Sequence, residues 1–230
     1  TSATQVSAVG ADGFTIGSNT YMNANGSSNK YVAWNWLAGG TPTATNSAGA
    51  GNAPTSGSVM IDGVASTSAL AGAIPATKLS ANTTAGFSIV SYTGIGGADK
   101  TIAHGLSSPP ELTIIKDRDS NSNNNQWQIS SSAVGDDYAY FTTAAFTGTA
   151  GAFPTTGDAT TLTIGRTGNV AVSTNESGDD FIMYNFHSVE GYSRVNTYTG
   201  NNTFNFVYTG FRPAFLLLKK TTASQTYCWQ

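Results

Sequence analysis

Hydrophobic and polar residues alternate along several short stretches of the chain. The clearest stretches are rich in β-branched and aromatic residues with a period of two, typical of half-buried strands: residues 112–116, 138–142 and 202–208. In the last of them, Phe204 and Phe206 would lie on the same face. Turns rich in Gly, Asn and Pro separate these stretches, and no segment keeps a helical period for three turns. The pattern therefore predicts an all-β fold, an antiparallel β-sandwich or jelly roll.

The chain also contains an internal repeat with a period of about 100 residues. In one half of the repeated unit three pairs match. Residues 86–94 match 191–200 and share turn glycines, 110–116 match 213–219 and share an apolar stretch that follows a proline, and Trp127 matches Trp229. In the other half the matching pairs are 14–17 with 162–165 and 31–36 with 181–186, which are 148 to 150 residues apart because an insert of about 44 residues lies between Trp36 and Gly86. The two sets together predict a chain built from whole and partial copies of one unit.

These matches divide the chain into four predicted parts. Residues 1–40 are the second half of a unit, 41–85 a linker or insert rich in Ala, Gly, Ser and Thr, 86–186 a complete β-sandwich unit, and 187–230 the first half of a next unit. A half-sandwich exposes an apolar face and a strand edge. Residues outside this sequence, an identical chain, or pairing of the two halves with each other could cover these faces. We expect a symmetric homo-oligomer.

The complete unit should bury most of its large apolar side chains. The expected contributors to the core or to its aromatic contacts are Phe87, Ile89, Ile114, Tyr140, Phe141, Ile164, Ile182, Tyr184 and Phe186.

Composition excludes several classes of protein. Only 10% of the 230 residues are charged and the net charge is −3, so the chain lacks the basic patch that nucleic acid requires. No apolar run approaches the length of a membrane span, and we expect no membrane insertion. One cysteine, Cys228, and two histidines exclude an internal disulfide, an ordinary zinc site, haem and iron–sulfur clusters. We therefore expect no cofactor.

The carboxylates do not form a catalytic pattern. Glycoside hydrolysis needs two carboxyl groups that face one cleft, and the one acid-x-acid pattern, Asp117 to Asp119, lies at a strand end that enters a turn. The same turn places oxygen ligands at Asp117, Asp119 and Asn121, as a calcium loop does. However, Ser122 replaces the usual glycine and Gln128 the usual bidentate glutamate. We expect no enzyme and regard calcium as a weak candidate.

Aromatic side chains are the remaining candidates for a binding site. Trp127, Trp34 and Trp36 could stack on sugar rings, and Asn35 could bind the sugar hydroxyl groups. On a strand, the indoles of Trp34 and Trp36 would lie on one face. The residues that match Trp34 and Trp36 in the repeat are also aromatic, which favours a core position for this pair over a binding role.

Six segments resemble a repeated domain of large virion proteins from marine bacteriophages. They are residues 12–17 (DGFTIG), 31–40 (YVAWNWLAGG), 80–90 (SANTTAGFSIV), 104–106 (HGL), 189–193 (VEGYS) and 208–215 (YTGFRPAF). The resemblance covers nearly the whole chain except the middle of 41–85. It implies a concanavalin A-like, lectin-type jelly roll, and it brings no catalytic residues with it.

The resemblance implies a structural protein on the surface of the phage particle, in a tail fibre, spike or similar appendage. Its expected partners are other virion subunits, including copies of itself, and carbohydrate on the host surface. The alternative is a passive spacer or capsid decoration that binds no ligand. A polysaccharide depolymerase is a third reading, which would need the facing carboxylates that the sequence lacks.

Overall fold

The computed structural model describes residues 6–18, 23–24, 30–119, 127–135, 137–141, 157–165, 174–222 and 228–229. The chain divides into two compact units, Thr1–Trp36 and Leu37–Gln230. Its regular structure consists almost entirely of β-strands, so the fold is all-β. Among the residues described, no helix is long and apolar enough to span a membrane.

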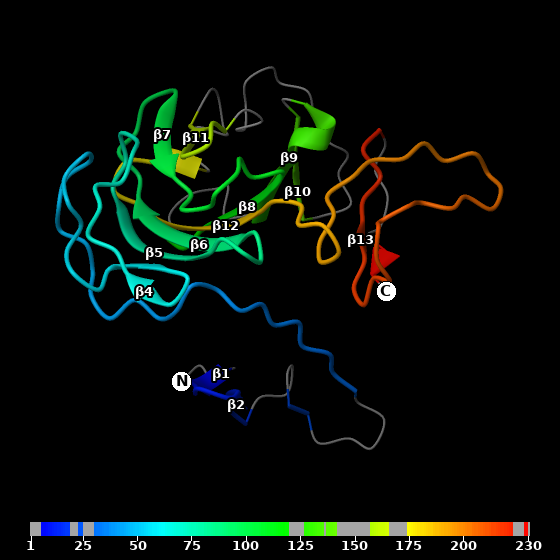
Figure 1. The fold of residues 1–230 in the computed structure, drawn as a ribbon, viewed down its shortest axis with the longest axis horizontal. Coiled ribbons are helices and arrows are strands. Elements are labelled where there is room, and N and C mark those ends of the chain that lie inside the picture. The colour runs from blue at the N-terminus through cyan, green and yellow to red at the C-terminus, as the bar shows by residue number, and fades with distance from the viewer. Residues whose placement is uncertain are drawn as a thin grey trace. The chain divides into compact units, whose positions relative to one another are not determined.

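Eight strands of the second unit form one sheet, in the order β10-β9-β8-β12-β6-β5-β3-β4 (Figure 1). Their bounds are β3 (Val59–Ile61), β4 (Val64–Ala65), β5 (Ala76–Asn82), β6 (Phe87–Thr93), β8 (Leu112–Asp117), β9 (Trp127–Ser131), β10 (Tyr138–Tyr140) and β12 (Asp180–Phe186). Neighbouring strands are antiparallel except for β3 and β5, which are parallel.

A second, two-stranded layer covers one face of this sheet. Strand β7 (Lys100–Ala103) pairs with β11 (Thr161–Ile164), and both lie above the main sheet in Figure 1. The core between the layers includes Ile102, Leu162 and Ile164 from the small layer. From the main sheet it includes Leu79, Val90, Tyr92, Ile115, Phe181 and Met183. The arrangement is sandwich-like, and we call the covered side of the main sheet its inner face and the opposite side its outer face.

The inner face of β12 is not the face that the sequence predicted as core. Phe181 and Met183 are 0% exposed, whereas Ile182, Tyr184 and Phe186 alternate with them and are only partly buried. Of the other predicted core residues, two are buried: Phe87 and Ile164. Those that are partly exposed are Ile89, Ile114, Tyr140 and Phe141. Both faces of these strands carry large apolar residues, so alternation alone could not identify the inner one.

A row of polar side chains crosses the inner face from β6 to β8. Ser88 donates a hydrogen bond to the carbonyl of His104 (2.6 Å), Asn185 Nδ2 donates to Ser88 Oγ (3.1 Å), and Thr113 donates to Asn185 Oδ1 (3.2 Å). All three side chains are buried. On β9, the buried polar atoms of the Gln128 and Ser130 side chains have no hydrogen-bond partner in the described part of the chain. The network therefore spans β6, β12 and β8.

Residues 41–85 are not simply a linker, because they supply three strands of the main sheet. Strand β5 pairs with β6 along its length, and Val59, Leu79 and Ala81 are fully buried. The chain before β3 also packs closely against β5. A Cβ atom on Gly39 would lie 1.9 Å from the carbonyl oxygen of Ala81, and Ser80 donates a hydrogen bond to the carbonyl of Gly40 (2.6 Å). The predicted boundary at residue 85 consequently falls inside the sheet.

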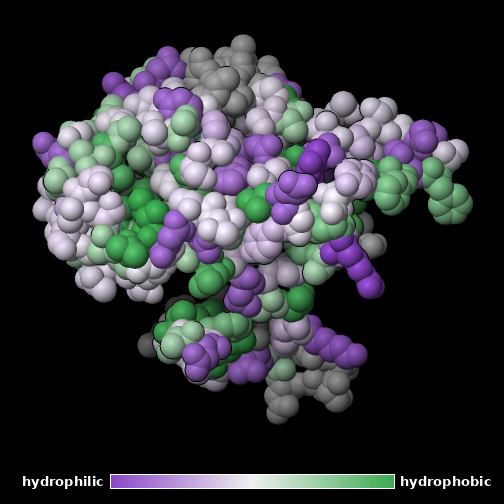
Figure 2. Space-filling model, in the orientation of Figure 1, coloured by the Kyte–Doolittle hydropathy of each residue, from purple (hydrophilic) through white to green (hydrophobic). Residues whose placement is uncertain are grey.

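The segment after β12 contains little regular structure. Residues 202–208 are not a strand, contrary to the sequence prediction, and Asn202 has a positive φ of 60°. Phe204 and Phe206 are fully exposed on a loop whose hydrophobic tip lies at the right of Figure 2. Beyond this loop, β13 (Leu217–Leu218) pairs with β14 (Cys228–Trp229).

The first unit contains a small antiparallel hairpin. Strand β1 (Val6–Val9) pairs with β2 (Phe14–Ile16), and Ser7 Oγ donates a hydrogen bond to the carbonyl of Thr15 (3.1 Å). Residues 30–36 form no strand, although their sequence matches that of β12.

Candidate functional site

Two aromatic side chains lie next to each other on the outer face of the main sheet. Trp127 opens β9 and is 43% exposed. Its ring centroid lies 6.0 Å from that of Tyr184 on β12, with the rings tilted by 31°. Strand register explains the contact. Trp127 pairs with Lys116, and Lys116 pairs with Ile182, so Trp127 shares the face that carries Tyr184. We call Trp127 and Tyr184 the aromatic platform.

A polar pocket of about 320 Å³ opens where β5, β6 and β12 meet. Its lining consists mainly of hydroxyl-bearing and charged residues: Thr45, Thr77, Lys78, Ser91, Tyr92, Thr93, Arg118, Asp180 and Phe181. The loop that carries Thr45 is fixed to β5, because Asn46 donates hydrogen bonds to the carbonyls of Thr77 (2.8 Å) and Ala76 (3.0 Å). The pocket is therefore built partly from residues 41–85.

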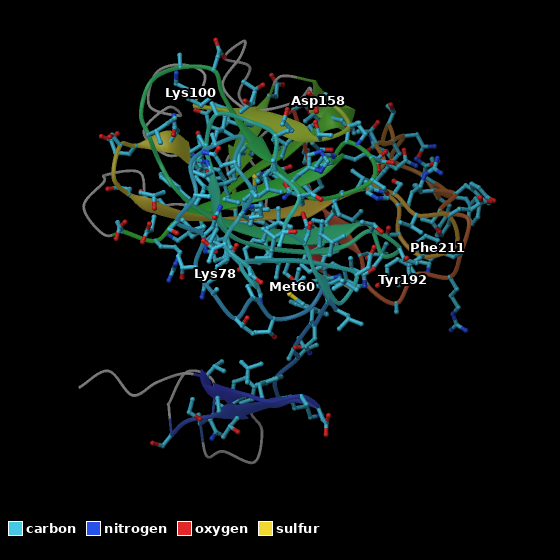
Figure 3. The ribbon with its side chains drawn as sticks, turned by 60° about the vertical axis from the view of Figure 1, so that its left-hand side comes forward. Met60, Lys78, Lys100, Asp158, Tyr192 and Phe211 are labelled. Carbon is cyan, nitrogen blue, oxygen red and sulfur yellow. The ribbon has the colours of Figure 1, made fainter. Side chains whose placement is uncertain are left out.

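Strand pairing places the floor of this pocket on the outer face. Ser91 pairs with Ile182, and Thr93 pairs with Asp180. Thr93 Oγ1 also donates a hydrogen bond of 2.7 Å to Asp180 Oδ1. Figure 3 shows Lys78 on the outer side of the main sheet, whereas Lys100 lies beside the β7–β11 layer. The pocket and the aromatic platform thus occupy the same face.

Arg118 links the pocket to the platform. It lines the pocket, and its backbone N–H donates to the carbonyl of Asp180 (2.8 Å). Its guanidinium also acts on Tyr184. Burial raises the pKa of the Tyr184 hydroxyl, and the positive charge of Arg118 partly offsets that rise.

Trp127 and Ser91 stand in one register row across β9, β8, β12 and β6, so three strand spacings separate them, roughly 14 Å.

Of the sequence-predicted binding residues, only Trp127 belongs to this face. Trp34, Asn35 and Trp36 belong to the unit Thr1–Trp36, and all three are exposed. Trp34 and Trp36 are each 44% exposed, but they do not share a strand face, because residues 30–36 form no strand. The prediction that both indoles lie on one face of a strand is therefore wrong, and the expected core position is wrong as well, because both side chains are exposed.

The calcium candidates act as turn-forming groups. Asp117 is 0% exposed on the inner face, and its Oδ1 accepts a hydrogen bond from the backbone N–H of Asp119 (2.9 Å). Asp119 Oδ2 accepts one from the backbone N–H of Asp180 (2.6 Å). Asn121 lies outside the described residues. Within the described ranges, no three His, Cys, Asp or Glu side chains lie close enough to hold a metal ion.

His104 is buried in the core and is held there by two hydrogen-bond contacts. It is 0% exposed, its Nδ1 accepts from the backbone N–H of Leu106 (3.1 Å), and its Nε2 lies 3.2 Å from the carbonyl oxygen of Asp158. Burial lowers its pKa, while the hydrogen bond to Asp158 works in the opposite direction. The neutral ring, protonated on Nε2, satisfies both contacts.

The pocket residues were missed at the sequence level because they come from distant segments. Lys78 and Thr77 lie in the predicted linker, Arg118 in the predicted calcium turn, and Asp180 in an adjacent acid pair that carries no motif. No local pattern brings them together. Only the pairing of β5 with β6, and of β6 with β12, does so.

Comparison with known proteins identifies a family but no function. Neither the curated proteins nor the solved structures contain a significant match to this chain. A family model described as a domain of unknown function, DUF7483, matches residues 61–230. The match includes β5 and most of the pocket, and it covers well over half of the chain. The chain therefore belongs to the DUF7483 family.

Proposed function

We propose that this chain is a structural protein on the surface of a phage particle, in a tail fibre, spike or similar appendage, and that the outer face of its main sheet binds host-surface glycan. The place in a virion is supported by the sequence resemblance described above. The binding role is supported by one observation: the half-exposed Trp127–Tyr184 pair shares a face with a pocket rich in hydroxyl groups.

The chemistry of this face suits a carbohydrate. An exposed indole offers a flat apolar surface to the C–H face of a sugar ring. The hydroxyls of Thr45, Thr77, Ser91 and Thr93 both donate and accept hydrogen bonds, as sugar hydroxyls do.

The arrangement of carboxylates in the pocket fits binding of a glycan rather than its cleavage. Asp180 is the one carboxylate among the described residues that line the pocket. Hydrolysis of a glycosidic bond requires a pair of carboxyl groups about 5–10 Å apart across the bond. We therefore propose a binding protein and not a depolymerase.

Binding to a glycan array, followed by calorimetry on the ligands found, tests this proposal. Trp127→Ala should weaken binding about tenfold or more, because tryptophans that a bound partner covers contribute strongly to binding energies. Trp127→Phe should retain part of the affinity. The matched control is Tyr192→Ala, which removes a ring that is 56% exposed in the segment after β12 and that does not line the pocket. If the wild-type protein binds no glycan, the result favours the alternative function of a passive spacer. If Trp127→Ala binds as tightly as the wild type, the aromatic platform is not part of the binding site.

A further inference from the structure

The pocket on the face of the aromatic platform contains two cations, and neither has a carboxylate partner among the residues that the structure describes. Lys78 projects from β5 and Arg118 follows the end of β8, and both are exposed. Within the described part of the chain, neither forms an ion pair. Asp180 also lines the pocket, but its Oδ1 accepts a hydrogen bond from Thr93. The lining thus carries one more positive than negative charge.

Such a pair is unusual in this chain. Lysine and arginine together account for 10 of the 230 residues, and the net charge is −3. Two of these cations converge on one pocket, where they are surrounded by the hydroxyls of Thr45, Thr77, Ser91 and Thr93. Cations and hydroxyl donors around one cavity are the groups that bind an oxyanion.

Neighbouring acids limit how much negative charge the pocket accepts. Asp117, Asp119 and Asp179 lie near the same strand ends but do not line the pocket. Burial, and then the charges of Asp117 and Asp119, raise the pKa of Asp179, so the surroundings are electronegative. This setting fits one oxyanion in the pocket rather than a run of negative charges.

We propose that the glycan bound by the outer face is acidic, and that a single carboxylate, sulfate or phosphate on one sugar lies between Lys78 and Arg118. The following sugars extend across β12 and β8 toward Trp127, which requires an oligosaccharide because the two ends are roughly 14 Å apart. This inference rests on the proposed function, and it adds the charge of the ligand and its direction on the sheet.

Binding of the full chain to matched acidic and neutral polysaccharides tests the inference. Alginate supplies carboxylates and carrageenan supplies sulfates; carboxyl-reduced alginate and desulfated carrageenan are their neutral counterparts. We expect at least one acidic polymer to bind about tenfold more tightly than its neutral counterpart. Lys78→Gln and Arg118→Gln should each weaken that binding about two- to fivefold, as exposed ion pairs do. Lys100→Gln, on the opposite layer, is the matched control.

Three results separate the inference from the proposed function. The inference is supported if the chain prefers an acidic polymer and if Lys78→Gln, Arg118→Gln and 1 M salt each reduce that preference. At 1 M salt the Debye length is about 3 Å, so the attraction between exposed charges is screened. Equal binding of acidic and neutral polymers, weakened by Trp127→Ala alone, would overturn the inference and leave the proposed function intact. Equal weakening by Lys100→Gln and Lys78→Gln would also overturn it, because the attraction would then be general rather than local.

Discussion

The inner and outer faces of β12 can be distinguished by one pair of substitutions. Met183 is 0% exposed and pairs with Ile115 and Val90, which are also fully buried. Its neighbour Ile182 points to the outer face and is partly exposed. Met183→Ala should cost about 2–5 kcal/mol, the range for truncating a buried Met or Leu. Ile182→Ala should cost about 1–2 kcal/mol, because part of its apolar surface already contacts water.

The measurement is urea unfolding of the full chain followed by far-UV circular dichroism. The m-values of both variants must equal that of the wild type, so that a change in midpoint reports a change in the free energy of unfolding. The two side chains are similar in size and adjacent in sequence, which makes each the control for the other. A larger loss for Ile182→Ala than for Met183→Ala would refute the reasoning, and the aromatic side of β12 would then be the core side.

Two further predictions concern the backbone and the core histidine. Gly94→Ala should destabilise the chain by about 1–3 kcal/mol in urea unfolding, since its Cβ would lie 2.0 Å from the carbonyl oxygen of Glu176. Gly200 occupies the matching position of the repeat, and a Cβ there meets no atom within 4 Å. Gly200→Ala should therefore be nearly neutral in the same measurement. Burial holds the pKa of His104 below its ordinary value of 6.5, so the unfolded chain binds the proton more readily and stability should fall as the pH falls below 6.5. His104→Gln should flatten this part of the profile of melting temperature against pH, and an unchanged slope would contradict the assignment.

The sequence patterns predicted that the fold consists of strands, but they did not predict which of two matching segments forms a strand. Residues 86–94 and 191–200 match in sequence, yet only the first segment contains a strand, β6, which lies between β5 and β12. Likewise 181–186 lie within β12, between β6 and β8, whereas 31–36 form no strand. Strand propensity expresses packing against neighbours more than an intrinsic backbone preference. The same residues therefore behave differently where neighbours are present and where they are not.

The composition of residues 41–85 was misleading for a related reason. A segment without aromatic residues reads as a linker, because large side chains usually mark a core. Here small residues permit close approach of two backbones. Gly39 lies directly against Ala81, and no larger side chain would fit between them. The same segment also builds the pocket, since β5 contributes Lys78 and the loop attached to β5 through Asn46 contributes Thr45.

The buried polar row explains how a sheet with two apolar faces selects one of them as its inner face. A slip of one residue in the pairing of β12 would turn Tyr184 and Ile182 inward and Asn185 outward, and it would replace one set of large apolar side chains on the inner face by another. It would also break the hydrogen bonds that connect Asn185 to Ser88 and Thr113. An orphaned buried polar group costs about 1–3 kcal/mol, so the network penalises the slipped register. The outcome leaves Tyr184 beside Trp127 on the outer face, where Trp127 is 43% exposed.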